Sequence, residues 1–191
     1  LYANLHLNPI SFDLEEASRK EAILVFVGDI MLDRGVERAV KDNGKDFPWI
    51  FEGIADNLRG ADILFGNLES VISDKGKKAG GRYTFRADPS SIKALTFAGF
   101  DVLSVANNHI FDYGREAMED SFKRLKTAGI DYVGGGFSEK EAFSVRIKEI
   151  KGTKIGFLAY TNLGPQLWMA KGANSGIALI KEKDIEKVKE L

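Results

Sequence analysis

Side chains that can bind a divalent metal follow three separate apolar runs of the sequence. The donors after these runs are, in chain order, Asp29, Glu69, and the pair Asn108 and His109. Carboxylate, amide and imidazole donors form a hard-to-borderline ligand set, which suits Mn²⁺, Zn²⁺ or Fe better than a metal that prefers thiolates. The sequence therefore indicates a metal site, provided that the three run ends meet in space.

Each donor taken alone also has an ordinary structural explanation. An Asp after a Gly, as at Asp29, is often a turn residue. Glu69 could be a solvated loop carboxylate, and His109 a half-buried histidine whose hydrogen bonds are satisfied. Asp112 could cap the N-terminus of a helix that begins near Arg115. The coincidence of donors at three run ends is what favours a site.

The elements that must position these donors alternate along the chain. Continuous β-branched and aromatic runs predict strands buried on both faces, and amphipathic segments between Pro and Gly residues predict helices. The expected strands are 22–27, 61–66, 101–106 and 130–133, and the expected helices are 34–41, 48–58, 89–98 and 115–128. The segments 144–150 and 154–160 flank a Lys-Gly-Thr turn and predict a hairpin. This order predicts an α/β fold with a mainly parallel sheet and helices on its faces, and ligands then bind at the carboxyl ends of the strands.

Several motifs resemble those of one protein family. They are Gly-Asp-Ile-Met-Leu at 28–32, Gly-Asn-Leu-Glu at 66–69, Ala-Asn-Asn-His at 106–109 and Asp-Tyr-Gly at 112–114. Together they resemble the CapA/PgsA family of poly-γ-glutamate capsule biosynthesis proteins, a branch of the calcineurin-like metallophosphatases. The resemblance covers about 23–160 and implies a metallophosphatase-like layered sandwich.

The resemblance also implies roles for individual residues. Asp29 would bind one metal ion, Glu69 would bridge two, and Asn108 would bind the second through its side-chain oxygen. His109 would be the nearby catalytic acid that stabilises the transition state or protonates the leaving oxygen of a phosphoester. Asn67 and Asp112 would hold the ligands or His109 in place. Members of the superfamily usually carry a His two residues after the first Asp, but Met31 stands there in this sequence.

The superfamily completes its site with later histidines, whereas this chain has two histidines in all, His6 and His109. His6 precedes the first expected strand and is interpreted as incidental. Residues 1–20 show mixed polarity and no sustained period, so we expect them to be an irregular arm or linker. Residues 21–191 are expected to be the N-terminal part of the domain, with its C-terminal part lying beyond this chain.

Composition excludes several functional classes. Among 191 residues, 27 basic and 28 acidic side chains give a net charge of −1, which gives no support to nucleic-acid binding. The absence of cysteine excludes disulfides and thiolate metal sites, and no apolar run is long enough to span a bilayer. The loop 73–82 carries Lys75, Lys77, Lys78 and Arg82, and it is either a solvated loop or a contact for an anionic polymer.

Two functions remain open at this stage. The first is a capsule or poly-γ-glutamate biosynthesis protein with a metal-dependent phosphoesterase-like site that acts on a phosphoester substrate. The alternative is a non-catalytic component that handles poly-γ-glutamate beside the subunits of a membrane-associated synthase. The resemblance implies the cell envelope, on the extracytoplasmic face of the membrane, as the location of either.

Overall fold

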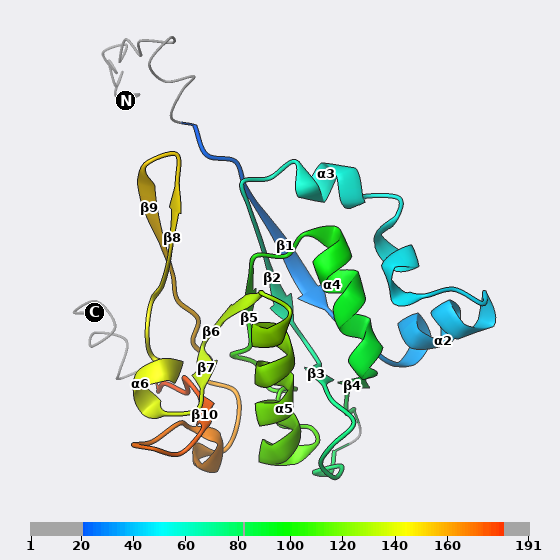
Figure 1. Cartoon of the computed structure of the whole chain (residues 1–191). Coiled ribbons are helices and arrows are strands. Elements are labelled where there is room, and N and C mark those ends of the chain that lie inside the picture. The colour runs from blue at the N-terminus through cyan, green and yellow to red at the C-terminus, as the bar shows by residue number, and fades with distance from the viewer. Residues whose placement is uncertain (1–20, 82, 182–191) are drawn as a thin grey trace, which may run out of the picture.

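A central parallel sheet organises the chain, as the computed structural model describes it for residues 21–81 and 83–181 (Figure 1). Its strands are β1 (Leu24–Ile30), β2 (Ile63–Leu68), β5 (Val102–Ser104) and β6 (Asp131–Val133). They lie in the order β1-β2-β5-β6, and every neighbouring pair is parallel. The predicted α/β class with a mainly parallel sheet is confirmed.

One face of this sheet is covered by helices α4 (Ile92–Ala98) and α5 (Gly114–Thr127), which lie side by side over the strands in Figure 1. Helix α5 turns Met118, Phe122 and Leu125 into the main core, as its helical spacing predicts. After α4 the chain turns at Gly99, where the backbone adopts a φ of 85° that favours glycine. The two helices thereby contribute buried side chains to the main core.

The other face is covered by the hairpin of β8 (Arg146–Ile150) and β9 (Thr153–Phe157), which confirms the predicted hairpin. Phe157 of β9 stacks on Phe65 of β2, with ring centroids 5.7 Å apart. On the edge strand β1, Leu24 packs against the hydrophobic cluster that includes Ile63 and Phe157, but Phe26 on the same face is 61% exposed. The expectation that 22–27 is buried on both faces is therefore wrong, because β1 is an edge strand and one of its faces is covered only in part.

Shorter elements complete the described part of the chain. They are α2 (Arg34–Asp42), the 3₁₀ turn η1 (Phe47–Phe51), α3 (Ala55–Arg59), β3 (Val71–Ile72), β4 (Arg86–Ala87), η2 (Pro89–Ser91), β7 (Gly135–Gly136), α6 (Glu139–Ala142), η3 (Gln166–Trp168) and β10 (Gly176–Ile177). Strand β3 pairs with β4 in parallel, and β7 pairs with β10 in antiparallel.

One helix prediction was wrong in detail. A single helix was expected over 48–58, but the chain forms η1 and then α3, separated by a turn at 52–54. Gly53 has a low helix propensity, and the aromatic side chains before it pack in a 3₁₀ turn instead of a regular α-helix.

Residues 1–20 lie outside the described part of the chain, so the expected N-terminal arm and His6 are not described. In the residues that are described, we find no helix that is both long enough and apolar enough to cross a membrane.

Candidate functional site

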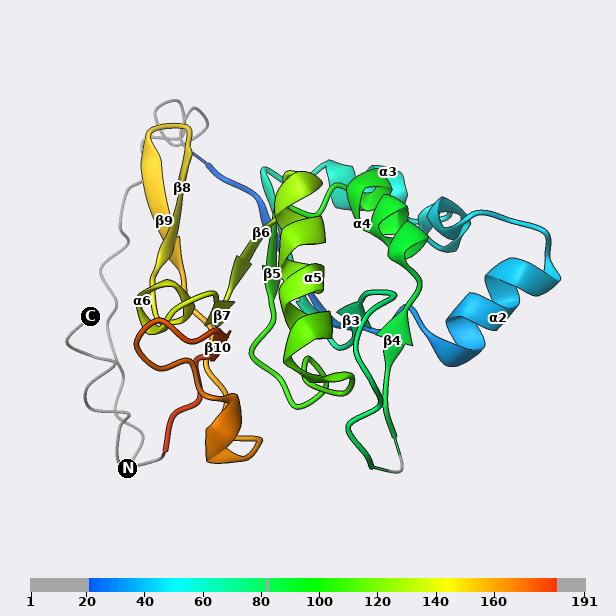
Figure 2. The same ribbon diagram turned by 60° about the horizontal axis from the view of Figure 1, so that its bottom comes forward.

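The predicted donors gather at the carboxyl ends of β1, β2 and β5, the edge that faces forward in Figure 2. In the pairing of β1 with β2, Phe26 lies opposite Phe65 and Asp29 lies opposite Asn67. Strand β1 therefore has one residue more than β2 between these two pairs, which is a β-bulge. Because side chains alternate across a strand, the bulge sets Asp29 opposite Asn67 and on the same face of the sheet.

The amide of Asn67 lies between two carboxylates. Its Nδ2 donates to Oδ1 of Asp29 at 2.8 Å and to Oε2 of Glu69 at 2.5 Å. The predicted same-side arrangement of Asn67 and Glu69 is therefore present, and the Glu69 side chain is only 17% exposed, which excludes a freely solvated loop carboxylate. A single neutral donor, the amide N–H₂ of Asn67, holds the two carboxylates together.

Asn107 connects β5 to β2 and was not singled out from the sequence. Its Nδ2 donates to Oδ1 of Asn67 at 3.1 Å and to the carbonyl oxygen of Leu68 at 2.9 Å. Its own Oδ1 accepts from the backbone N–H groups of His109 and Ile110 at 3.0 and 3.1 Å. Asn107 thus fixes the loop that presents His109. Its place directly after Ala106, where β5 leads into that loop, is the only sequence signal for this role.

His109 is oriented from two sides. Its Nδ1 lies 2.7 Å from Oδ2 of Asp112, and since a carboxylate only accepts, Nδ1 carries the proton. The imidazole also packs against the ring of Phe85, with centroids 4.2 Å apart. The backbone N–H of Phe85 donates to the same Asp112 oxygen at 2.7 Å. The Nε2 atom is then directed towards Glu69, 3.8 Å from its Oε1.

The alternative role for Asp112, as the cap of the following helix, does not hold. The capping residue of α5 is Tyr113, and no side chain caps this helix end. Asp112 instead binds His109 and Phe85. The contribution of Phe85 could not be recognised from the sequence, because this residue lies in a loop that is distant in sequence from the ends of β2 and β5.

The electrostatics of the cluster are dominated by its carboxylates. Burial raises the pKa of Glu69, and the nearby charge of Asp29 adds to this shift, while the hydrogen bond from Asn67 opposes it. Within the described residues, no Lys or Arg forms an ion pair with Asp29, Glu69 or Asp112. The cluster therefore carries negative charge that the chain itself does not neutralise with a lysine or arginine.

This arrangement fits a divalent cation in part. Asp29 and Glu69 converge on one point, the Nδ2 of Asn67, and lack a Lys or Arg partner among the described residues. The third predicted ligand, Asn108, makes no side-chain hydrogen bond with any described residue, so the structure does not join it to the cluster. Across residues 21–81 and 83–181, no three His, Cys, Asp or Glu side chains form a group that could hold a metal ion. A cation here would rely on amide oxygens in addition to the two carboxylates.

The lysine-bearing loop packs beside this cluster. The backbone N–H of Ala79 donates to the carbonyl oxygen of Asp112 at 2.8 Å. Gly76 adopts a φ of 75°, and a Cβ at this position would lie 2.0 Å from the carbonyl oxygen of Tyr113. Lys77 and Lys78 are exposed, while Arg82 lies outside the described residues. The loop therefore places exposed cations near the strand ends.

A comparison with models of known protein families shows to which family the chain belongs. Residues 23–190 match the profile of the bacterial capsule synthesis protein family PGA_cap. The chain belongs to this family. The match extends over nearly the whole chain, so the resemblance derived from the motifs at the strand ends is confirmed.

Several curated relatives agree with this PGA_cap assignment. The chain is 31% identical over 153 residues to the capsule biosynthesis protein CapA of Bacillus anthracis, a match that covers 78% of this chain and 37% of the relative. It is 31% identical over 155 residues to the PGA biosynthesis protein CapA of Bacillus subtilis, covering 80% and 40%. It is 26% identical over 204 residues to a probable polyglutamine synthesis accessory protein of Mycobacterium tuberculosis, covering 87% and 53%. The chain thus spans about two fifths of the length of the two CapA proteins.

Proposed function

We propose that the chain contributes to capsule or poly-γ-glutamate biosynthesis through a metal-dependent phosphoesterase-like site at the strand ends. The observation that carries the proposal is the convergence of Asp29 and Glu69 on one point with no Lys or Arg paired to them among the described residues. Two carboxylates held close together favour a bound cation, because like charges at short range repel each other and a cation relieves that repulsion.

In this proposal Asp29 and Glu69 hold a divalent ion such as Mn²⁺, Zn²⁺ or Fe, with Asn108 able to add an amide oxygen. The ion would supply Lewis-acid stabilisation of the charge that develops on a phosphoester. Asn67 holds the two carboxylates at a fixed separation. In its doubly protonated form, His109 would donate from Nδ1 to Asp112 and present the proton at Nε2 to the leaving oxygen.

The test is hydrolysis of p-nitrophenyl phosphate and bis-p-nitrophenyl phosphate with added Mn²⁺. Glu69→Gln should lower kcat/KM by about 100-fold or more, and His109→Gln should lower kcat by about 100-fold while metal affinity is retained. Glu149→Gln, on the exposed outer side of β8, is the matched control and should behave like the unaltered protein. Equal activity in Glu69→Gln and the control would refute the proposed site.

A second candidate is a non-catalytic role in handling an anionic polymer beside membrane synthase subunits at the cell envelope. It is favoured by the exposed Lys77 and Lys78 on the loop next to the strand ends. Poly-γ-glutamate binding that persists in Glu69→Gln and in chelator, but is weakened in Lys77→Gln/Lys78→Gln, would support this role over catalysis. Unchanged binding in the lysine variant would argue against it.

A further inference from the structure

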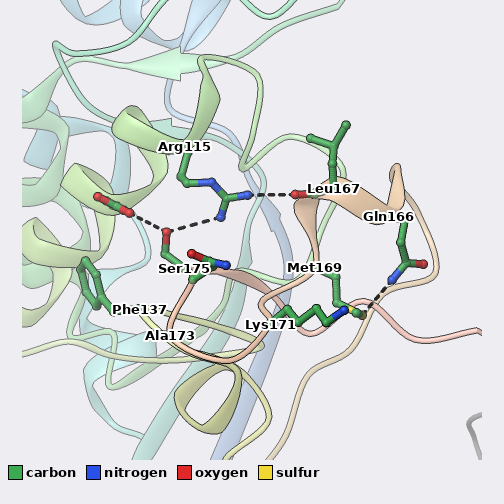
Figure 3. A pocket seen from close by; sticks show the side chains of 10 residues that line it. Arg115, Phe137, Gln166, Leu167, Met169, Lys171, Ala173 and Ser175 are labelled. Carbon is green, nitrogen blue, oxygen red and sulfur yellow. Dashed lines mark hydrogen bonds between the residues drawn. The ribbon is translucent and has the colours of Figure 1, made fainter.

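A cavity lies apart from the carboxylate cluster, between the first turns of helix α5 and the loop 166–175. Figure 3 shows it with its lining side chains, and its volume is about 620 Å³. This size falls within the roughly 300–1,000 Å³ of small-molecule sites. Its lining is partly apolar and includes Phe137, Leu167 and Met169.

The helix side of the cavity carries one cation and one anion that are not paired directly with each other. Arg115 and Glu119 are four residues apart on α5, yet each binds the same hydroxyl group and not the other charged side chain. Arg115 Nη1 lies 3.4 Å from Ser175 Oγ, and that hydroxyl donates to Glu119 Oε1 at 2.5 Å (Figure 3). Ser175 is buried, so its position is fixed by the fold.

Both charged groups keep free hydrogen-bonding capacity. The guanidinium of Arg115 is anchored by a 2.8 Å bond to the carbonyl oxygen of Leu167 and lies over the ring of Phe111. Arginine has five N–H donors, so most of them remain available. Glu119 Oε2 accepts no hydrogen bond from any residue that the structure describes. A preorganised cation and anion therefore face the same space.

The opposite wall adds a second cation. Lys171 comes from the loop that faces α5, is exposed, and forms no ion pair with a described residue. Arg115 and Lys171 against Glu119 give the cavity a formal charge of +1. A ligand with an ammonium group and two carboxylates would complement all three side chains.

We infer that this cavity binds a free amino acid, with its ammonium group on Glu119 and its carboxylate on Arg115, and that Lys171 selects for an acidic side chain. The inference does not depend on phosphoester chemistry or on a bound metal. It uses neither Asp29 nor Glu69, so the two proposals can fail separately.

An amide NMR titration of the protein in chelator tests this inference. Aspartate and glutamate should bind with dissociation constants of roughly millimolar order, alanine more weakly and lysine not measurably. N-acetylation of the ligand, which removes the ammonium group, should weaken binding at least about fivefold. The shifted amides should include those of Ser175 and its neighbours in the loop.

Two substitutions test the roles of Lys171 and Glu119 in ligand binding. Neither side chain is fully buried, so the fold should be retained. Lys171→Gln should lower the preference for acidic over neutral ligands by about fivefold. Glu119→Gln keeps an acceptor for Ser175 and should abolish the discrimination against the N-acetylated ligand. Lys93→Gln, an exposed lysine on α4, is the matched control and should change neither property.

Three results would overturn the inference. The first is the absence of saturable shifts with every amino acid tested. The second is equal affinity for free and N-acetylated ligands. The third is a set of shifts centred on His109 and Glu69 that leaves Ser175 unchanged.

Discussion

Glu69 after strand β2 and Asp120 in helix α5 are both largely shielded from water, but their surroundings differ in charge. Asp120 is 7% exposed and is bound by three cationic or hydroxyl donors. They are Arg124 Nε at 2.7 Å, Ser73 Oγ at 2.8 Å and Lys75 Nζ at 3.0 Å. Among the described residues, Glu69 accepts a hydrogen bond only from the amide of Asn67, and His109 Nε2 lies 3.8 Å from its Oε1.

The pKa values of the two carboxyl groups shift in opposite directions for this reason. Burial raises the pKa of Glu69, and Asp29 adds to the rise. Burial also acts to raise the pKa of Asp120, but the hydrogen bonds from Arg124, Ser73 and Lys75 outweigh it and hold that pKa below its ordinary value. The chain thus neutralises Asp120 with its own cations, whereas the carboxylates at the strand ends have no Lys or Arg partner among the described residues.

The largest effect is expected when the neutralised carboxylate is removed. Asp120→Ala leaves Arg124 Nε, Lys75 and the buried Ser73 hydroxyl without this acceptor, while Arg124 keeps its bond to Asp74, so the free energy of unfolding should fall by about 3 kcal/mol. Urea unfolding measures this loss. Asp56→Ala, which removes a carboxylate whose side chain is 98% exposed, is the control and should leave stability almost unchanged. Equal losses in the two variants would contradict the structural role of Asp120.

A divalent metal should act on one cluster and not on the other. Mn²⁺ at about 100 times its dissociation constant should stabilise the unaltered protein by about 2.7 kcal/mol. Thermal unfolding with and without Mn²⁺ should show the gain in Asp120→Asn but not in Glu69→Gln. A gain that survives in Glu69→Gln would place the metal elsewhere.

The pH dependence of stability should have opposite signs for the two groups in metal-free protein. The raised pKa of Glu69 means that the folded state holds its proton more tightly, so stability falls as pH rises above the ordinary value of 4.5. The lowered pKa of Asp120 gives stability that is present above its ordinary value of 3.8 and is lost as pH falls through the folded value. In Glu69→Gln, the free energy of unfolding should no longer fall as pH rises above 4.5. In Asp120→Asn, it should lose the part of its decrease below pH 3.8 that Asp120 causes. Identical pH profiles in both variants would reject the assignment.

The smallest effect is expected from Glu69→Gln at neutral pH without metal. The substitution removes a partly desolvated charge near Asp29, so stability should rise by about 0.5 kcal/mol, a small gain because the site keeps some contact with water. Urea unfolding in chelator checks the sign, with Glu149→Gln as a matched control. A clear loss of stability would show that the charge of Glu69 is compensated in the folded protein.

Much of the fold followed from local patterns in the sequence. The buried runs, the amphipathic spacing of Met118, Phe122 and Leu125 and the turn at 151–153 depend on neighbouring residues, so they predicted the sheet, α5 and the hairpin. The exposure of Phe26 could not be predicted in this way, because a continuous apolar run does not reveal whether its strand lies at the edge or in the centre of a sheet.

The candidate site was predictable only as a set of strand ends. Parallel strands bring their carboxyl ends to one edge, which explains why Asp29, Glu69 and His109 lie together. The roles of Asn107 and Phe85 depend on contacts between segments that are distant in sequence, so the position of Asn107 directly after Ala106 could not by itself reveal them. For the same reason the sequence could not distinguish Asp120, which has its own cations, from the carboxylates that lack them.

The bulge in β1 makes one position of the chain behave unusually under genetic change. A Cβ added at Gly28 would meet no atom within 4 Å, and the backbone there does not require glycine, so replacement by alanine should be tolerated. Deletion of Gly28 would remove the extra residue, restore regular pairing with β2 and keep Asp29 opposite Asn67 on the same face of the sheet. A library of single-residue deletions should therefore tolerate the loss of this residue, although it lies within a strand.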